Sequence, residues 1–375
     1  RAQTAARRSG EPSMGAPRPP YSLLLAILAV GVHGAWDHLL KQGILQQGSD
    51  YNSILRHRGH GRDSREIDDE VLLGANRDVT RPTVVMSVLA GRERYLKVLK
   101  TYMDILLEQD SITEVHIWDY TRTESDKLFC ERMCAGHPKY RLMRPSHPRQ
   151  DNFHEYYEFY FSLSKNYTDG NAMLLKSDDD IVYMDVSAFD NFINAALDDG
   201  QKTLYFPNIV NNDVCTLLQC RRGIHGLMPE DMVNTNVMVY GSETPLSNLQ
   251  ESTEMASEIH AMFLKEPSSF SMKGYETVRW GSNIPPNMFA VPMPHVKEMF
   301  GFMVERHLDE RFLTGPACLK FQRPNALLLG LTVSHFSFYG QDSESLDEKF
   351  LSGYSELGHK VLSQFNGDHE EDDRT

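Results

Sequence analysis

One short stretch constrains this chain more than any other: an apolar run that ends in three consecutive carboxylates. Residues 173–183 read MLLKSDDDIVY, so a strand-like segment meets Asp178, Asp179 and Asp180 and then a second apolar step. Adjacent carboxylates repel one another, and partial burial increases the repulsion. A divalent cation such as Mg²⁺ or Mn²⁺ relieves it, because these ions prefer hard oxygen ligands.

The three acids do not face the same way in an extended chain. Asp178 and Asp180 point to one side and Asp179 to the other, since side chains alternate along a strand. The spacing therefore predicts two metal ligands, Asp178 and Asp180, and one structural acid. A solvated acidic turn is the alternative, but the apolar residues on both sides favour acids held at the end of a core strand.

Segments that favour strands and helices alternate after residue 81, which predicts an α/β fold. Strands are expected over 83–89, 114–119, 140–143, 203–207 (ending at Pro207) and 331–339. Helices are expected over 94–108, 125–133, 151–165, 185–197 and 254–264. The first part of this order describes right-handed βαβ units, whose ligands bind beyond the carboxyl ends of the strands.

A strand, an Asp-x-Asp step and a following helix, midway along such a chain, resemble the metal-binding signature of GT-A-fold glycosyltransferases. The string Lys176–Tyr183 resembles that of poorly characterised eukaryotic members, and the resemblance extends over roughly Pro82–Gly340. It implies a Rossmann-related single domain with a central mixed, mainly parallel sheet flanked by helices. It also implies that a sugar moves from a nucleotide-sugar donor to a hydroxyl of a glycan, protein or lipid acceptor, with Mn²⁺ or Mg²⁺ as cofactor.

The same resemblance implies roles for single residues. His335, in a late apolar run, becomes the third metal ligand, and Asp309 or Glu310 becomes the base that takes the acceptor proton. The nucleotide-sugar would contact residues at the strand ends, namely Ala90, Arg92, Asp119, Lys176, Asp178 and Asp179. Arg221 or Arg222 could neutralise the leaving diphosphate. For each of these residues a core or solvated-loop role is the alternative.

Composition narrows the function classes. The formal charge of −14 argues against a general nucleic-acid binder, because nucleic acids attract basic surfaces. An enzyme for anionic nucleotide-sugars with this charge needs a metal and local Lys or Arg residues at its site. None of the five cysteines has zinc-type spacing. Cys215 and Cys220 could close a small loop in an oxidising compartment, the alternative being that all five are reduced.

The N-terminal region predicts targeting to the secretory pathway. A basic flank precedes the apolar run Tyr21–Trp36, so residues 1–36 are expected to be a cleaved signal peptide or a type II signal-anchor with a cytoplasmic basic end. The expected location is the Golgi or ER membrane with a lumenal catalytic domain, or secretion if the signal is cleaved. The sequon Asn166-Tyr167-Thr168 agrees with a lumenal glycoprotein.

The remaining chain divides by composition. Residues 37–80 are expected to be a stem or linker, and 81–365 the GT-A-like domain, with a nucleotide-sugar half (81–215) and an acceptor half (216–340). Residues 366–375 are expected to be an acidic, disordered tail.

Two other function classes remain open. A metal-dependent nucleotidyltransferase or phosphohydrolase also clusters aspartates at a strand end, but usually with further acids on neighbouring strands. A non-catalytic lumenal protein that binds a sugar nucleotide would keep the metal and lack turnover. The sequence contains neither a GxxxxGK[ST] phosphate loop nor a GxSxG elbow, which argues against P-loop ATPases and α/β-hydrolases.

Overall fold

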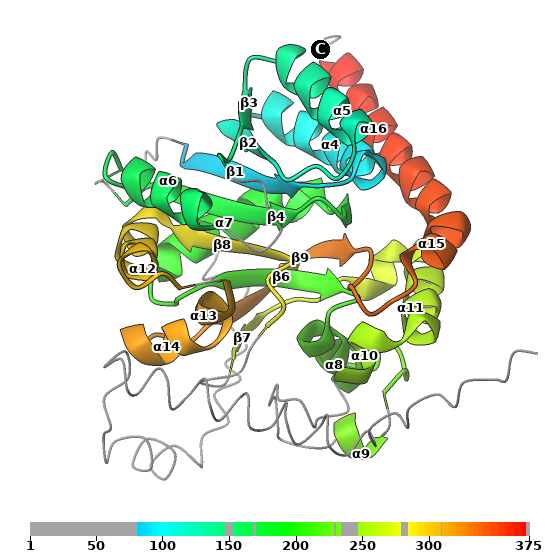
Figure 1. Cartoon of the computed structure of the whole chain (residues 1–375). Coiled ribbons are helices and arrows are strands. Elements are labelled where there is room, and N and C mark those ends of the chain that lie inside the picture. Colours follow the sequence, from blue (N-terminus) through cyan, green and yellow to red (C-terminus); the bar gives the residue numbers. More distant parts are fainter. Residues whose placement is uncertain are drawn as a thin grey trace, which may run out of the picture. The chain divides into compact units, whose positions relative to one another are not determined.

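Figure 1 shows the computed structural model of the chain. The structure describes residues 81–146, 153–167, 170–228, 230–233, 247–278, 284–308 and 310–372. All of them belong to the second of the two compact units into which the chain divides, His57–Thr375. The expected N-terminal segment (1–36), the expected stem (37–80) and Asp309 lie outside the described residues.

The strands are β1 Thr83–Ala90, β2 Glu114–Asp119, β3 Tyr140–Met143, β4 Ala172–Asp178, β5 Ile181–Met184, β6 Tyr205–Val210, β7 Tyr275–Thr277, β8 Met288–Pro292 and β9 Ala326–His335. Within the described ranges they form one sheet in the order β3-β2-β1-β4-β8-β6-β9-β5, with β7 beside β9. β1 to β4, β6 and β9 run in one direction, and β5, β7 and β8 run in the other. The predicted mixed, mainly parallel sheet is confirmed.

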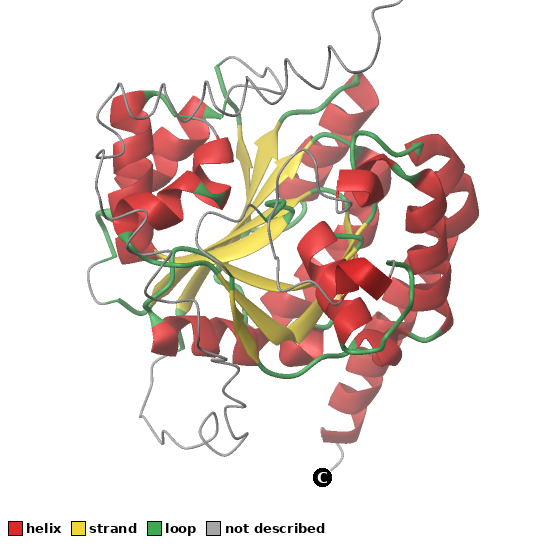
Figure 2. Ribbon diagram, turned by 90° about the horizontal axis from the view of Figure 1, so that it is seen from below, coloured by secondary structure: helices red, strands yellow, loops and turns green. Residues whose placement is uncertain are grey.

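Helices flank this sheet on both sides (Figure 2). The helices are α4 Glu93–Glu108, α5 Glu124–Ala135, α6 His154–Ser164, α7 Phe189–Asp199, α8 Asp213–Arg221, α9 Glu230–Val233, α10 Ser247–Glu251, α11 Thr253–Lys265, α12 Met293–Arg306, α13 Glu310–Thr314, α14 Pro316–Phe321, α15 Ser343–Leu346 and α16 Ser352–Asp372. Shorter helical turns cover Val186–Ala188, Pro267–Phe270 and Asp347–Leu351. None of the helices that the structure describes combines the length and apolar character needed to cross a membrane.

The core follows from the hydrophobic pattern. β4, β6 and β8 are buried along almost their whole length, as expected of central strands covered on both faces. In α4, Tyr95, Leu99, Tyr102 and Leu106 recur every three or four residues and are all buried. The helix packs this stripe against β5 and its neighbouring helices α5 and α16.

The boundary of β6 differs from the prediction. The strand does not stop at Pro207 but continues to Val210, and its register against β9 shifts between Pro207 and Asn208. Proline has no N–H to donate to a neighbouring strand, so the hydrogen-bond ladder breaks there. The strand resumes beyond the shift because Asn208, Ile209 and Val210 are buried and pair with Thr332, Val333 and Ser334 of β9.

Three further expectations can be compared with the structure. All five cysteines are free, and Cys215 and Cys220 both lie in helix α8, so they close no loop. Strands from the expected acceptor half, β8 and β9, lie between or beside strands of the nucleotide-sugar half, so both halves share one sheet. Helix α16 continues to Asp372, into the segment for which a disordered tail was expected.

Candidate functional site

The sheet brings several chain segments to one edge. β1 lies between β2 and β4, and its last residues align Leu89 with Asp178 and Ala90 with Asp119. Since parallel strands end at the same edge, the residues after β1, β2 and β4 converge there. The antiparallel strand β8 starts at this edge, where the Asn287 carbonyl accepts a hydrogen bond from the Asp178 N–H at 2.8 Å.

The pairing of β5 with β9 brings His335 to the same edge of the sheet. β5 runs antiparallel to β9 and aligns Ile181 with His335, and the Phe336 N–H donates to the Asp180 carbonyl at 2.8 Å. His335 is therefore brought beside the acids, although it follows Asp180 by 155 positions in the sequence. Asp178, Asp180 and His335 each offer one ligand atom, and these atoms lie within 4.8 Å of one another.

The donor set fits a divalent cation. Two carboxylates and one imidazole suit Mn²⁺ or Mg²⁺ supplemented by ligand or water oxygens. Asp180 is 2% exposed, and its Oδ1 has no hydrogen-bond partner among the described residues. A buried carboxylate oxygen without a partner is costly, and a bound cation supplies the missing interaction.

The orientation of His335 supports the same use. Its Nδ1 lies 3.3 Å from the Asn211 carbonyl, so this nitrogen carries the proton and donates it. When the ring is neutral, as it is when it binds a metal, Nε2 presents a lone pair; this atom lies 3.5 Å from Asp180 Oδ2. Asn211 adopts a left-handed conformation with φ of 57°, which directs its carbonyl toward the ring. Such a backbone contact fixes the tautomer of a metal-binding histidine.

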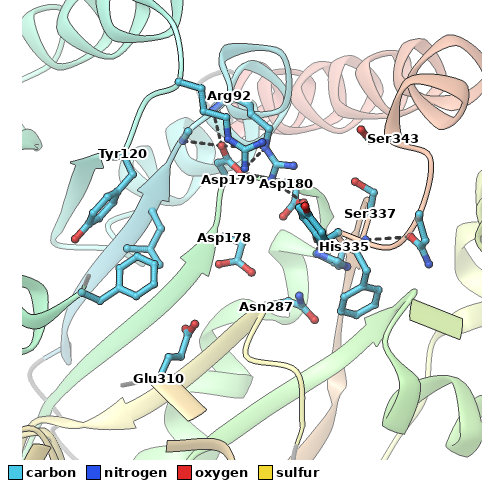
Figure 3. Close-up of a pocket in the computed structure, with 17 residues that line it drawn as sticks. Arg92, Tyr120, Asp178, Asp179, Asp180, Asn287, Glu310, His335, Ser337 and Ser343 are labelled. Carbon is cyan, nitrogen blue, oxygen red and sulfur yellow. Dashed lines mark hydrogen bonds and ion pairs between the residues drawn. The ribbon is translucent and has the colours of Figure 1, made fainter. Parts of the chain in front are cut away.

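Asp179 points away from this group, as the strand alternation predicts. Its Oδ2 accepts hydrogen bonds from the Gly91 N–H at 2.7 Å and the Arg92 N–H at 2.6 Å. The Arg92 guanidinium donates to Asp179 Oδ1 at 2.6 Å and to Asp180 Oδ2 at 2.8 Å (Figure 3). Asp179 thus connects the acidic segment to the loop after β1 through hydrogen bonds.

Arg92 controls the charge of this pair of acids. Burial would lower the pKa of Arg92, but Asp180 and Asp179 raise it above its usual range. Burial opposes ionisation of Asp180, yet His335 and Arg92 outweigh it and hold the pKa of Asp180 below its usual value. Burial raises the pKa of Asp179, and the Arg92 guanidinium opposes that shift.

Lys176 neutralises the other side of the site. It is 2% exposed, and its Nζ lies 2.7 Å from Asp178 Oδ1 and 3.1 Å from Glu310 Oε1. It also donates to the Pro286 carbonyl. Burial would lower the pKa of Lys176, but Asp178 and Glu310 raise it above its usual range. Lys176 is therefore a buried, fixed positive charge beside Asp178 and Glu310.

A cavity of about 510 Å³ opens onto these groups. Its wall includes Arg92, the three aspartates, Glu310 and His335 (Figure 3). This volume lies in the range of about 300–1,000 Å³ that is usual for small-molecule sites.

The structure does not bring every predicted residue to this cavity. Ala90 is fully buried, and Lys176 lies behind the wall. The Asp119 carboxylate accepts hydrogen bonds from the Thr121 N–H at 3.3 Å and the Thr121 hydroxyl at 2.6 Å. Of the two candidate bases, Glu310 lines the cavity and Asp309 lies outside the described residues.

Other residues of the cavity wall were not predicted. Tyr120 and Arg122 follow β2 directly, and the position of ligands beyond strand ends could have identified them. Ser337 follows His335 by two positions, and Asn287 immediately precedes β8. Gln341 has no comparable signal in the sequence, because it reaches the cavity only through the turn after β9.

Comparisons with known proteins are distant. No protein-family model matches the sequence, and no curated protein matches it. A 4-diphosphocytidyl-2C-methyl-D-erythritol synthase from Anaerococcus prevotii DSM 20548 matches with a TM-score of 0.36 and 12% identity, over 74% of this chain and 96% of that one. GalNAc-T7, solved with UDP, GalNAc and Mn²⁺, matches with a TM-score of 0.39 and 11% identity, over 77% of this chain and 55% of that one.

Proposed function

We propose that this chain is a metal-dependent glycosyltransferase, which moves a sugar from a nucleoside-diphosphate sugar to a hydroxyl acceptor. One observation carries the proposal: Asp178, Asp180 and His335 gather at the carboxyl edge of a mainly parallel sheet and face a cavity. Glu310 lines the same cavity, so a carboxylate that can accept a proton lies near the proposed metal. The resemblance of the Asp-x-Asp segment to GT-A enzymes supports the same reaction class.

Each residue has a defined task in this reaction. Asp178, Asp180 and His335 would hold the divalent cation, which acts as a Lewis acid toward the leaving diphosphate. Arg92 fixes Asp179 and Asp180, and so keeps the ligand positions rigid. In an inverting reaction Glu310 takes the proton of the acceptor hydroxyl, and Lys176 Nζ, 3.1 Å from Glu310 Oε1, holds this side chain in place. A retaining reaction needs no such base.

The test is a screen of UDP- and GDP-sugars with the full chain and Mn²⁺ or Mg²⁺, scored by release of nucleoside diphosphate. We expect metal-dependent release from one donor class, its loss in Asp180→Asn, and its retention in Asp190→Asn. Asp190 is an exposed acid of α7 outside the cavity wall, so it controls for removal of one charge.

Two outcomes would replace the proposal. Release of nucleoside monophosphate or pyrophosphate, rather than nucleoside diphosphate, would indicate a nucleotidyltransferase or phosphohydrolase. Metal-dependent binding of a nucleotide-sugar without turnover on any glycan, protein or lipid acceptor would indicate a non-catalytic binding protein.

For the location we propose the secretory pathway, with the catalytic domain in the lumen of the Golgi or ER. The basic flank and apolar run within residues 1–36 support this, and so does the exposed Asn166 in the turn after α6. In a eukaryotic cell, Asn166→Gln should remove a glycosidase-sensitive mass shift. An unshifted wild-type chain in a cytosolic fraction would contradict the proposed location.

A further inference from the structure

In the described part of the chain, three basic side chains lie in or directly behind the wall of the cavity, and two of them are already paired with acids. Arg92 bonds Asp179 and Asp180. Lys176, almost fully buried, bonds Asp178 and Glu310. Neither has its charge available for a ligand, although the sequence predicted both as nucleotide contacts.

Arg122 is different. It lies between β2 and α5, lines the cavity and is exposed. Its backbone N–H donates to the Gly91 carbonyl at 3.3 Å, which fixes the loop on β1. Within the described ranges its guanidinium forms no ion pair or hydrogen bond.

The surroundings of Gly91 show how close the Arg122 side chain lies to the acids. A Cβ at Gly91 would be 3.6 Å from Arg122 Nε and 3.5 Å from Asp179 Oδ2. Arg122 Nε and Asp179 Oδ2 therefore lie on the same side of the Gly91 backbone. The guanidinium of Arg122 is therefore held near the acidic segment, while Asp179 is already paired with Arg92.

The charge balance of the loaded site shows what Arg122 could serve. Among the described residues, four carboxylates line the cavity: Asp178, Asp179, Asp180 and Glu310. One divalent cation together with Arg92 and Lys176 balances them, and a metal-bound histidine is neutral. Arg122 is then a surplus positive charge. A surplus guanidinium in a cavity favours an anionic ligand, and its planar donors suit phosphate oxygens.

We propose that Arg122 contacts a phosphate group of the donor, a role for which the sequence had suggested Arg221 or Arg222. In the structure Arg222 pairs with Glu276 at 3.1 Å and Arg221 donates to the Val233 carbonyl at 3.0 Å. Neither residue lines the cavity. The proposal rests on the proposed function of the site, and it identifies the group of the donor that a protein side chain contacts in addition to the metal.

The experiment measures binding of inorganic pyrophosphate to the full chain by calorimetry, with and without Mn²⁺. Arg122→Gln should weaken Mn²⁺-dependent pyrophosphate binding about tenfold, since a hydrogen bond to a charged group is lost. Arg122→Lys should lose less, because lysine keeps the charge without the planar donors. Binding of Mn²⁺ alone should not weaken in Arg122→Gln. Arg132→Gln is the matched control: Arg132 is exposed, lies on α5 and does not line the cavity.

Each possible result decides the matter. Three results would overturn the contact. They are equal pyrophosphate binding by wild type and Arg122→Gln, equal weakening in Arg122→Gln and the control Arg132→Gln, and no pyrophosphate binding by wild type. A higher KM for an acceptor with unchanged pyrophosphate binding would also overturn it. If pyrophosphate binding depends on Arg122 but no donor turns over, the contact stands and the transferase proposal fails. If donors turn over equally in wild type and Arg122→Gln, the transferase stands and the contact fails.

Discussion

Asp180 and Asp213 are both buried aspartates, and they behave in opposite ways. They are 2% and 0% exposed, and each has an Oδ1 without a hydrogen-bond partner among the described residues. Asp180 lies beside Arg92 and His335, which hold its pKa below its usual value against the effect of burial. Among the described residues, the side chain that donates to Asp213 is neutral, Gln250 Nε2 at 2.7 Å, and burial raises the pKa of Asp213 to about 7.

The difference shows what turns a buried acid into a metal ligand. Burial alone favours the protonated form, which cannot bind a cation. Arg92 and His335 keep Asp180 charged, and the cavity gives a ligand access to it. Asp213 has neither a basic partner in the described part of the chain nor a place in the cavity wall, so we expect it to have a structural role only.

The largest effect should be on turnover, which we expect to fall when Asp180 is replaced and to persist when Asp213 is replaced. Asp180→Asn removes one of three proposed ligands, and a metal supplies several kcal/mol of transition-state stabilisation. We expect roughly a thousandfold loss of metal-dependent turnover, about 4 kcal/mol. Asp213→Asn should retain turnover. Steady-state rates at saturating Mn²⁺ measure both, and comparable losses in the two variants would refute the distinction.

The next effect concerns Lys176, the buried lysine that pairs with Asp178 and Glu310. Lys176→Met leaves the Asp178 and Glu310 carboxylates without their shared counter-charge, which should cost about 3 kcal/mol of folding free energy. Urea unfolding without metal measures it. Lys97→Met is the control, because the Lys97 side chain is 59% exposed and pairs with Glu93 on the surface of α4. We expect its change to stay within about 0.5 kcal/mol. A similar small change for Lys176→Met would show that Lys176 does not balance these acids.

Another effect on stability has the opposite sign, and it depends on pH. The folded pKa of Asp213, about 7, lies above its ordinary value of 3.8. The stability that its protonated form contributes is therefore complete below pH 3.8 and is lost as the pH rises through 7. Asp213→Asn cannot ionise, so it should be more stable than wild type by about 4 kcal/mol at pH 8 and nearly equal to it at pH 4.

Unfolding by urea in EDTA at several pH values checks this difference between variant and wild type. EDTA keeps metal binding at the other aspartate from contributing. A difference that does not change with pH would mean that Asp213 has the same protonation state in the folded and unfolded chain.

The smallest effect tests the backbone that orients His335. Asn211 has φ of 57°, so Asn211→Ala adds strain of about 1–2 kcal/mol that Asn211→Gly avoids. Both variants remove the Asn211 side-chain hydrogen bonds to the Phe336 carbonyl and to Gln341. Thermal unfolding of the pair should therefore place the alanine variant lower. Equal stability would show that the backbone at this position relaxes when the side chain is removed.

Local pattern was enough for the elements that the sequence predicted well. The bounds of β2 and β3 agree with the predicted ranges, because each is a short run of apolar or β-branched residues between polar segments. Pro207 misled the prediction for β6, since a strand can continue past a proline when the residues beyond it are buried and paired.

The sequence by itself determined the α/β class, the strand that runs into the three aspartates, and the opposite directions of Asp178 and Asp179. These follow from hydrophobic periodicity and from the alternation of side chains, which are local properties of a chain. The tertiary structure alone decided which cations each acid meets, because Arg92, Lys176 and His335 reach the acids through strand pairing and loop contacts. It also decided that Arg122, rather than Arg92, has an uncommitted charge in the cavity wall. Electrostatic environment depends on distances across the fold, and the order of residues does not specify those distances.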